Sequence, residues 1–119
     1  MPKYRCLMIG AGGMGGCWIR SFFATFPERM EITGLVDIRE EALHSSGDFL
    51  GLSADQRFTS QEEAFSRTEA DFCCIVTPPA FHEQSVMLAI EHGMDILSEK
   101  PIADTWEACV RICQSLIHI

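Results

Sequence analysis

A glycine-rich turn near the start of the chain has the spacing G-x-G-x-x-G, with glycines at Gly10, Gly12 and Gly15. An apolar run precedes it and a helical pattern follows it, which is the context in which this motif binds dinucleotides. Gly10 permits the tight turn, Gly12 lets the backbone approach a pyrophosphate, and Gly15 lets the helix pack closely on the strand. We therefore expect the N–H groups of the first helical turn to hold phosphates.

A second candidate is Asp37, which closes the apolar run at residues 32–36. An acidic residue about 20 positions after the glycine motif accepts hydrogen bonds from the ribose 2′-hydroxyl. Because Asp37 would also repel a 2′-phosphate, it favours NAD over NADP. Arg39 follows two residues later and could neutralise such a phosphate, so NADP remains an alternative. The structural alternative for Asp37 is an N-cap of the next helix.

The elements that must position these residues alternate between strand and helix. Apolar runs predict strands at residues 4–9, 32–37, 71–76 and 94–97, and residues 56–59 are interpreted as a short, poor strand near an edge of the sheet. Helices are predicted after the glycine turn, near residues 39–50, from a capping box at 60–63 through 65, from the prolines at 78–79 to 92, and from an N-cap at Asp104. This order implies one α/β domain, residues 1–119, with a doubly wound, Rossmann-type parallel sheet of about five strands.

The first helix has a predicted inward face, which we interpret as core packing rather than as a cofactor contact. Its residues are Met14, Cys17, Trp18, Ser21, Phe22 and Thr25. Six cysteines lie mostly in apolar segments and are interpreted as small buried hydrophobes of a reduced, cytoplasmic protein. Two of them, Cys109 and Cys113, share a helix face, but no further pair accompanies them, so no metal site is expected.

Charge and hydropathy exclude two classes of protein. The net charge is −8 and no basic stripe is present, so the chain is not expected to bind nucleic acid. No apolar stretch is long enough to cross a membrane.

Four motifs occur in order: the glycine block at 10–15, Val36-Asp37, the segment Val76-Thr77-Pro78-Pro79-Ala80-Phe81-His82, and Glu99-Lys100-Pro101. Together they resemble the nucleotide-binding domain of the glucose-fructose oxidoreductase, inositol dehydrogenase and MocA (Gfo/Idh/MocA) family, over essentially the whole chain. The resemblance implies an oxidoreductase that transfers hydride between NAD(P) and a secondary alcohol. Its substrate would be a sugar, a polyol or a similar small molecule.

The resemblance also assigns site residues. Lys100 matches the catalytic lysine beside the nicotinamide and the substrate hydroxyl, with Glu99 orienting it. The cofactor-binding positions, by the same resemblance, are Gly10, Gly12, Gly13, Met14, Gly15, Asp37, Arg39, Thr77, Pro78, Pro79, His82, Glu99 and Lys100.

The chain departs from the family in length. Members continue into a C-terminal domain that carries the substrate pocket, further catalytic residues and the interface of a homo-oligomer, and residues 1–119 lack it. The alternatives to a dehydrogenase half are therefore a stand-alone, non-catalytic nucleotide-binding module or an inactive truncated fragment. A methyltransferase that uses S-adenosylmethionine shares the glycine-rich turn, but it does not explain Glu99-Lys100-Pro101.

Overall fold

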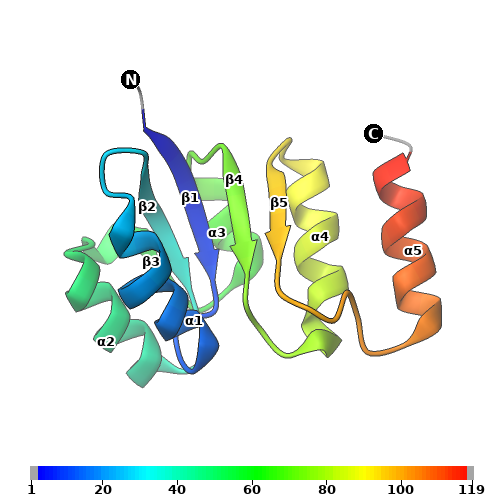
Figure 1. Cartoon of the computed structure of the whole chain (residues 1–119), viewed down its shortest axis with the longest axis horizontal. Helices are drawn as coiled ribbons and strands as arrows, with labels where there is room; N and C mark the ends of the chain where they lie inside the picture. The colour runs from blue at the N-terminus through cyan, green and yellow to red at the C-terminus, as the bar shows by residue number, and fades with distance from the viewer. Residues whose placement is uncertain (1–2, 118–119) are drawn as a thin grey trace.

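The structure, a computed structural model, describes residues 3–117, so the ends of the predicted domain at 1–2 and 118–119 lie outside it. A five-stranded parallel sheet in the order β3-β2-β1-β4-β5 forms its centre (Figure 1). The strands are β1 (Tyr4–Ile9), β2 (Met30–Val36), β3 (Arg57–Phe58), β4 (Phe72–Ile75) and β5 (Asp95–Ser98). The predicted doubly wound sheet is thereby confirmed.

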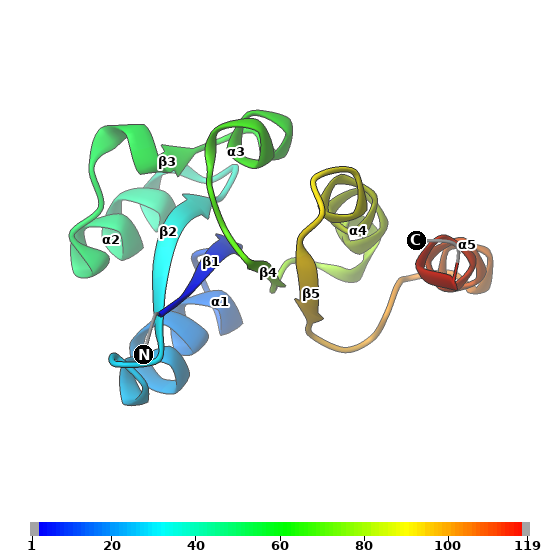
Figure 2. The same cartoon turned by 90° about the horizontal axis from the view of Figure 1, so that it is seen from above.

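Helices cover both faces of this sheet (Figure 2). One face carries α1 (Met14–Cys17), which continues as a π-helical turn (Trp18–Phe22) and a 3-10 turn (Phe23–Thr25), together with α2 (Glu40–Leu50). The other face carries α3 (Gln61–Arg67) and α4 (His82–Glu91), and α5 (Trp106–Ile117) packs against α4 beyond β5 (Figure 2). Short 3-10 turns at Ala54–Gln56 and Pro79–Phe81 precede β3 and α4. Strand, helix and strand follow one another along the chain, which is the arrangement of right-handed crossovers.

Two hydrophobic cores result, one on each side of the sheet. Leu7, Ile9 and Cys73 point toward α3, α4 and α5, whereas Met8 and Cys74 point toward α1 and α2. This alternation follows from the strand geometry, because successive side chains leave opposite faces.

The predicted inward face of the first helix is wrong except at Trp18, which is half-buried and packs against the core. Met14 and Cys17 are exposed, and the buried positions are Gly15, Gly16 and Ile19. The reason is the close approach of helix and turn: a Cβ at Gly15 would lie 2.5 Å from the Gly10 carbonyl oxygen. Counting apolar side chains selects the neighbouring face, because the side that contacts the sheet is mostly bare backbone.

Two further sequence predictions need correction. Thr105 rather than Asp104 caps α5, since its hydroxyl accepts a hydrogen bond from the Ala108 N–H at 3.1 Å. Cys17 and Cys113 are exposed, so the interpretation of the cysteines as buried hydrophobes holds only for part of the set; all six are free thiols.

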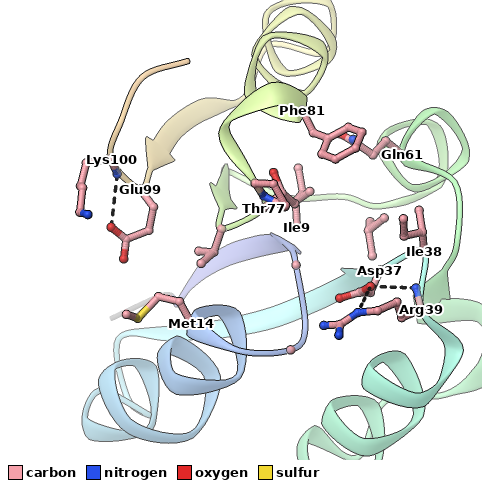
Figure 3. A pocket seen from close by; sticks show the side chains of 15 residues that line it. Ile9, Met14, Asp37, Ile38, Arg39, Gln61, Thr77, Phe81, Glu99 and Lys100 are labelled. Atoms are coloured by element: carbon pink, nitrogen blue, oxygen red, sulfur yellow. Dashed lines mark hydrogen bonds and ion pairs between the residues drawn. The ribbon is translucent and has the colours of Figure 1, made fainter. Parts of the chain in front are cut away.

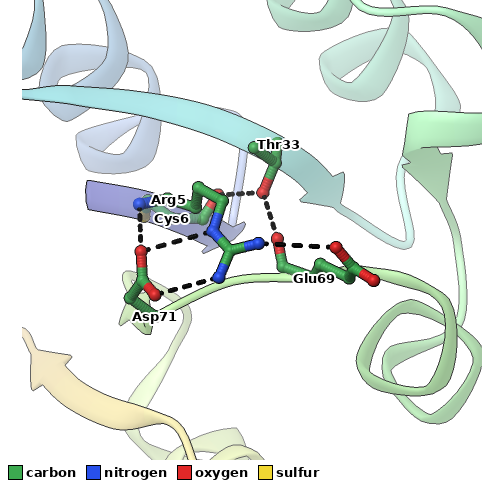
Figure 4. Close-up of polar contacts among 5 residues, drawn as sticks. All are labelled: Arg5, Cys6, Thr33, Glu69 and Asp71. Atoms are coloured by element: carbon green, nitrogen blue, oxygen red, sulfur yellow. Dashed lines mark hydrogen bonds and ion pairs between the residues drawn. The ribbon is translucent and has the colours of Figure 1, made fainter. Parts of the chain in front are cut away.

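An ion-pair cluster ties β1 to the segment before β4 at the amino edge of the sheet (Figure 4). The Arg5 guanidinium donates to Asp71 Oδ1 at 3.1 Å, and the Arg5 backbone N–H donates to Asp71 Oδ2 at 2.7 Å. These contacts with Arg5 lower the pKa of the Asp71 carboxyl below its ordinary value. The Thr33 hydroxyl joins β2 to the same segment by donating to the Glu69 carbonyl at 3.0 Å.

Candidate functional site

A cavity of about 690 Å³ opens at the carboxyl edge of the sheet, where β1, β2, β4 and β5 end (Figure 3). Doubly wound sheets bind ligands in this position, outside the carboxyl ends of the strands and between helices of opposite faces. Its two ends differ chemically. Asp37, Ile38 and Arg39 lie at one end, and Glu99 and Lys100 lie at the other (Figure 3).

The glycine turn passes between β2 and β4, and glycine is required at its first position. Gly10 has a φ of 107°, and a Cβ there would lie 2.2 Å from the Val76 carbonyl oxygen. Its N–H donates to the Val36 carbonyl at 2.9 Å, which locks the turn to β2. No L side chain fits this backbone conformation without strain.

At Gly12 the space beside the backbone is taken mainly by a side chain rather than by backbone. A Cβ there would lie 2.3 Å from the end of the Arg39 guanidinium and 3.2 Å from the Ala42 Cβ. The Arg39 side chain is 67% exposed, so the group in front of Gly12 is a solvent-exposed cation. The turn therefore presents bare backbone beneath an arginine, an arrangement suited to an anion.

Asp37 is held by backbone donors from two elements. Its Oδ2 accepts from the Ala11 N–H at 2.9 Å, and its Oδ1 accepts from the Arg39 N–H at 2.8 Å. The side chain is only 10% exposed, and each oxygen retains a second lone pair for a ligand. The structural alternative, an N-cap role for Asp37, is wrong, because the N-cap of α2 is Arg39 and no side chain caps this helix.

The segment after β4 contributes Thr77 and Pro78 to the cavity wall. The Thr77 Oγ1 atom is buried and has no hydrogen-bond partner among the described residues. Buried hydroxyls are almost always paired, so this atom points to a ligand that supplies the partner.

His82, a predicted cofactor contact, lies elsewhere. It is fully buried, with Nε2 2.8 Å from the Thr77 carbonyl oxygen and Nδ1 3.1 Å from the Ile102 carbonyl oxygen. Neither His82 nor Pro79 lines the cavity. The His82 ring, at the start of α4, therefore lies in the protein interior, where it joins the segments after β4 and β5.

Glu99 and Lys100 form the end of the cavity beyond β5. The Glu99 Oε2 atom accepts a hydrogen bond from the Trp18 indole N–H at 2.9 Å, and its Oε1 accepts from the Lys100 N–H at 3.3 Å. The Lys100 side chain lies near the mouth of the cavity, apart from the Glu99 carboxylate (Figure 3).

Several lining residues escaped the sequence analysis. They are Ile9, Val36, Ile38, Gln61, Val76 and Phe81. Ile38 directly follows Asp37, and Phe81 lies inside the 76–82 motif, so the sequence could have placed both residues at the cavity. Gln61 starts a helix far from either motif, and nothing in the sequence indicated that it lines the cavity.

No metal site or membrane span accompanies the cavity. Across residues 3–117, His, Cys, Asp and Glu side chains form no group of three or more that could hold a metal ion. Within the same part of the chain, every helix is too short or too polar to cross a membrane.

Comparison with known proteins gives consistent matches. The Gfo/Idh/MocA family model, described as "Oxidoreductase family, NAD-binding Rossmann fold", matches residues 4–117. An uncharacterized protein of Sinorhizobium fredii is 50% identical over 115 residues, covering 95% of this chain and 32% of that protein. An inositol 2-dehydrogenase of Corynebacterium glutamicum is 37% identical over 107 residues, covering 90% of this chain and 31% of that enzyme.

A solved structure is similar over the same region. The WlbA dehydrogenase from Bordetella pertussis, in complex with NADH and UDP-GlcNAcA, aligns with a TM-score of 0.88 and 25% identity, covering 98% of this chain and 34% of that chain. The present chain therefore spans about a third of the length of the relatives that it matches.

Proposed function

This chain belongs to the Gfo/Idh/MocA oxidoreductase family and has its NAD-binding Rossmann fold, and from this premise we propose that it is the cofactor half of a dehydrogenase. The enzyme would transfer hydride between NAD and a secondary alcohol of a polyol, a sugar or a similar small molecule. One observation carries the proposal: a single cavity joins the glycine turn and Asp37 to Glu99 and Lys100.

Two features of the cavity fit a dinucleotide. The backbone at Gly12 leaves a cradle that a Cβ would fill, and Thr77 Oγ1 lacks a partner. In the proposal, the glycine turn and Arg39 hold the pyrophosphate, and Thr77 hydrogen-bonds the nicotinamide half. Asp37 accepts hydrogen bonds from the adenosine ribose, with its carboxylate already oriented by two backbone N–H groups. This fixed negative charge supports NAD as the preferred cofactor, with Arg39 as the residue that would favour NADP.

Lys100 is the proposed catalytic residue. When bound, a nicotinamide cofactor supplies the hydride acceptor that no side chain provides. The Lys100 amine hydrogen-bonds the substrate hydroxyl and takes its proton as the carbon loses hydride. The Glu99 carboxylate accepts a hydrogen bond from the Lys100 backbone N–H and so orients Lys100.

A fluorescence titration tests the cofactor assignment. We expect saturable NADH binding to the purified chain, weaker NADPH binding, and loss of both in the Gly12→Val variant, because the larger side chain fills the cradle. Preference for NADPH would assign selectivity to Arg39. Absence of binding by a chain that circular dichroism shows to be folded would contradict the proposal.

A second candidate is a nucleotide-binding module without catalysis, because the features that fit a dinucleotide, the bare backbone at Gly12 and the Thr77 Oγ1 without a partner among the described residues, serve binding rather than turnover. Reduction of NAD in the presence of myo-inositol or another polyol, lost in Lys100→Ala, supports the dehydrogenase. NADH binding with no turnover on a polyol and sugar panel supports the module.

A further inference from the structure

The Trp18 side chain reaches the far end of the cavity from the opposite end of the sequence. It lies 81 positions before Glu99, yet its indole N–H donates to Glu99 Oε2 at 2.9 Å. The donor belongs to the π-helical turn that follows α1, and the acceptor directly follows β5. The contact therefore joins the helix after the glycine turn to the segment that carries Lys100.

Neighbouring rings fix the direction of this indole. Phe22 packs against it edge-on, with ring centroids 5.0 Å apart and an interplanar angle of 84°. Phe23 lies at a centroid distance of 5.3 Å. Aromatic contacts of this geometry restrict the side-chain rotamer, so the N–H is aimed at the carboxylate before any ligand arrives.

Glu99 is correspondingly fixed at its backbone and at both carboxylate oxygens. Its own N–H donates to the Ile75 carbonyl at 2.9 Å, which keeps it in register with β4. With Trp18 on Oε2 and the Lys100 N–H on Oε1, the carboxylate is a bridge between the first helix and Lys100. Hydrogen bonds to an ionised acceptor are stronger than hydrogen bonds between neutral groups. The Glu99 carboxylate can therefore hold the Lys100 backbone in place relative to the first helix.

We infer that Trp18 is a positioning residue for the nicotinamide end of the cavity, acting through Glu99 on Lys100. This inference rests on the proposed function. It predicts that the indole N–H contributes to binding of the nicotinamide half and contributes nothing to the adenosine half, because Asp37 and Arg39 lie at the other end of the cavity. A tryptophan that only fills the core would affect both halves equally.

Binding of two ligands to the full chain separates these cases. We expect Trp18→Phe to raise the Kd for NADH at least about tenfold, as loss of one hydrogen bond to a charged group implies, and to leave the Kd for ADP-ribose unchanged. Trp106→Phe is the matched control, because Trp106 is 78% exposed and does not line the cavity. Glu99→Ala should weaken NADH binding similarly, and the double variant should be no weaker than Glu99→Ala.

A measurement on the unaltered Trp18 guards against misfolding of the variant. In the 15N-labelled chain, Glu99→Ala should move the Trp18 indole N–H resonance and leave that of Trp106 in place. Equal weakening of NADH and ADP-ribose by Trp18→Phe, additive effects in the double variant, or an unmoved Trp18 resonance would each overturn the inference. Failure of the unmodified chain to bind NADH would instead refute the proposed function.

Discussion

Replacement of Gly10 and of Gly12 by alanine should separate folding from binding, although the two glycines are neighbours in one motif. At Gly10, a φ of 107° and the Val76 carbonyl oxygen 2.2 Å from the new Cβ both oppose the substitution. A non-glycine residue in a strained conformation costs about 1–3 kcal/mol. Displacing the backbone of β1 from that of β4 adds a similar overpacking cost of about 1–3 kcal/mol.

The sum, about 2–6 kcal/mol, is a large share of the stability of a small domain. Since 1 kcal/mol shifts the Tm of a domain of about 100 residues by at least 4 °C, Gly10→Ala should lower the Tm by at least about 8 °C. At Gly12 the nearest atom belongs to the exposed end of Arg39, which can swing aside, and the Ala42 Cβ at 3.2 Å needs to move by only a few tenths of an ångström. The free energy of unfolding should therefore change by less than about 1 kcal/mol in Gly12→Ala.

At Gly12 the substitution should weaken cofactor binding although it hardly changes stability. The alanine methyl stands where the proposed pyrophosphate approaches the backbone, so the Kd for NADH should rise at least about tenfold, which corresponds to 1.4 kcal/mol. Thermal unfolding followed by circular dichroism and titration of NADH fluorescence, in one buffer, measure both quantities. An unchanged Tm for Gly10→Ala, or a loss of stability in Gly12→Ala that matches its loss of binding, would refute this reasoning.

Two further predictions concern groups away from the cavity. Arg5→Gln should lower the Tm by a few degrees at most, because the pair with Asp71 is partly exposed. Arg5 lowers the pKa of the Asp71 carboxyl below 3.8, so the stabilisation by this pair is fully present above pH 3.8 and is lost as the pH falls through the lowered pKa. The Tm difference between the unmodified chain and Arg5→Gln should therefore shrink on acidification, and a difference that grows contradicts the assignment. Burial raises the pKa of the Cys73 and Cys74 thiols to about 12, so a disulfide reagent at pH 8 should label exposed Cys17 and reach these two only after unfolding. Rapid labelling of all six thiols in the native chain would show that the core opens.

The parts of this structure that could be predicted from sequence depend on local signals. Apolar runs became β1, β2, β4 and β5, whereas β3 is a strand of only two residues, Arg57–Phe58. Gly51 and Gly93, both with positive φ, follow α2 and α4, where glycine commonly ends a helix. The glycine turn was identifiable because three glycines at fixed spacing, Gly10, Gly12 and Gly15, follow a strand. Each of these signals lies within a few residues of the feature that it predicts.

The features that could not be predicted depend on contacts between distant segments. The burial of His82 requires the Ile102 carbonyl, 20 residues away, and the role of Trp18 requires Glu99. The orientation of the first helix depends on how closely Gly15 approaches Gly10, which no count of apolar residues measures. The residue type did not reveal where the His82 and Trp18 side chains lie, because their partners are a backbone carbonyl and a carboxylate from other elements.

The position of β5 at the border of the sheet has a consequence for amide hydrogen exchange. The N–H groups of Asp95 and Glu99 donate to carbonyls on the β4 side. Because N–H groups alternate along a strand, that of Leu97 also points toward β4, and those of Ile96 and Ser98 point outward. These two amides should exchange quickly with deuterated water in this chain. If a longer form of the protein or a partner adds a strand there, they alone should become slow while Leu97 keeps its rate, so two amides report whether the sheet has been extended.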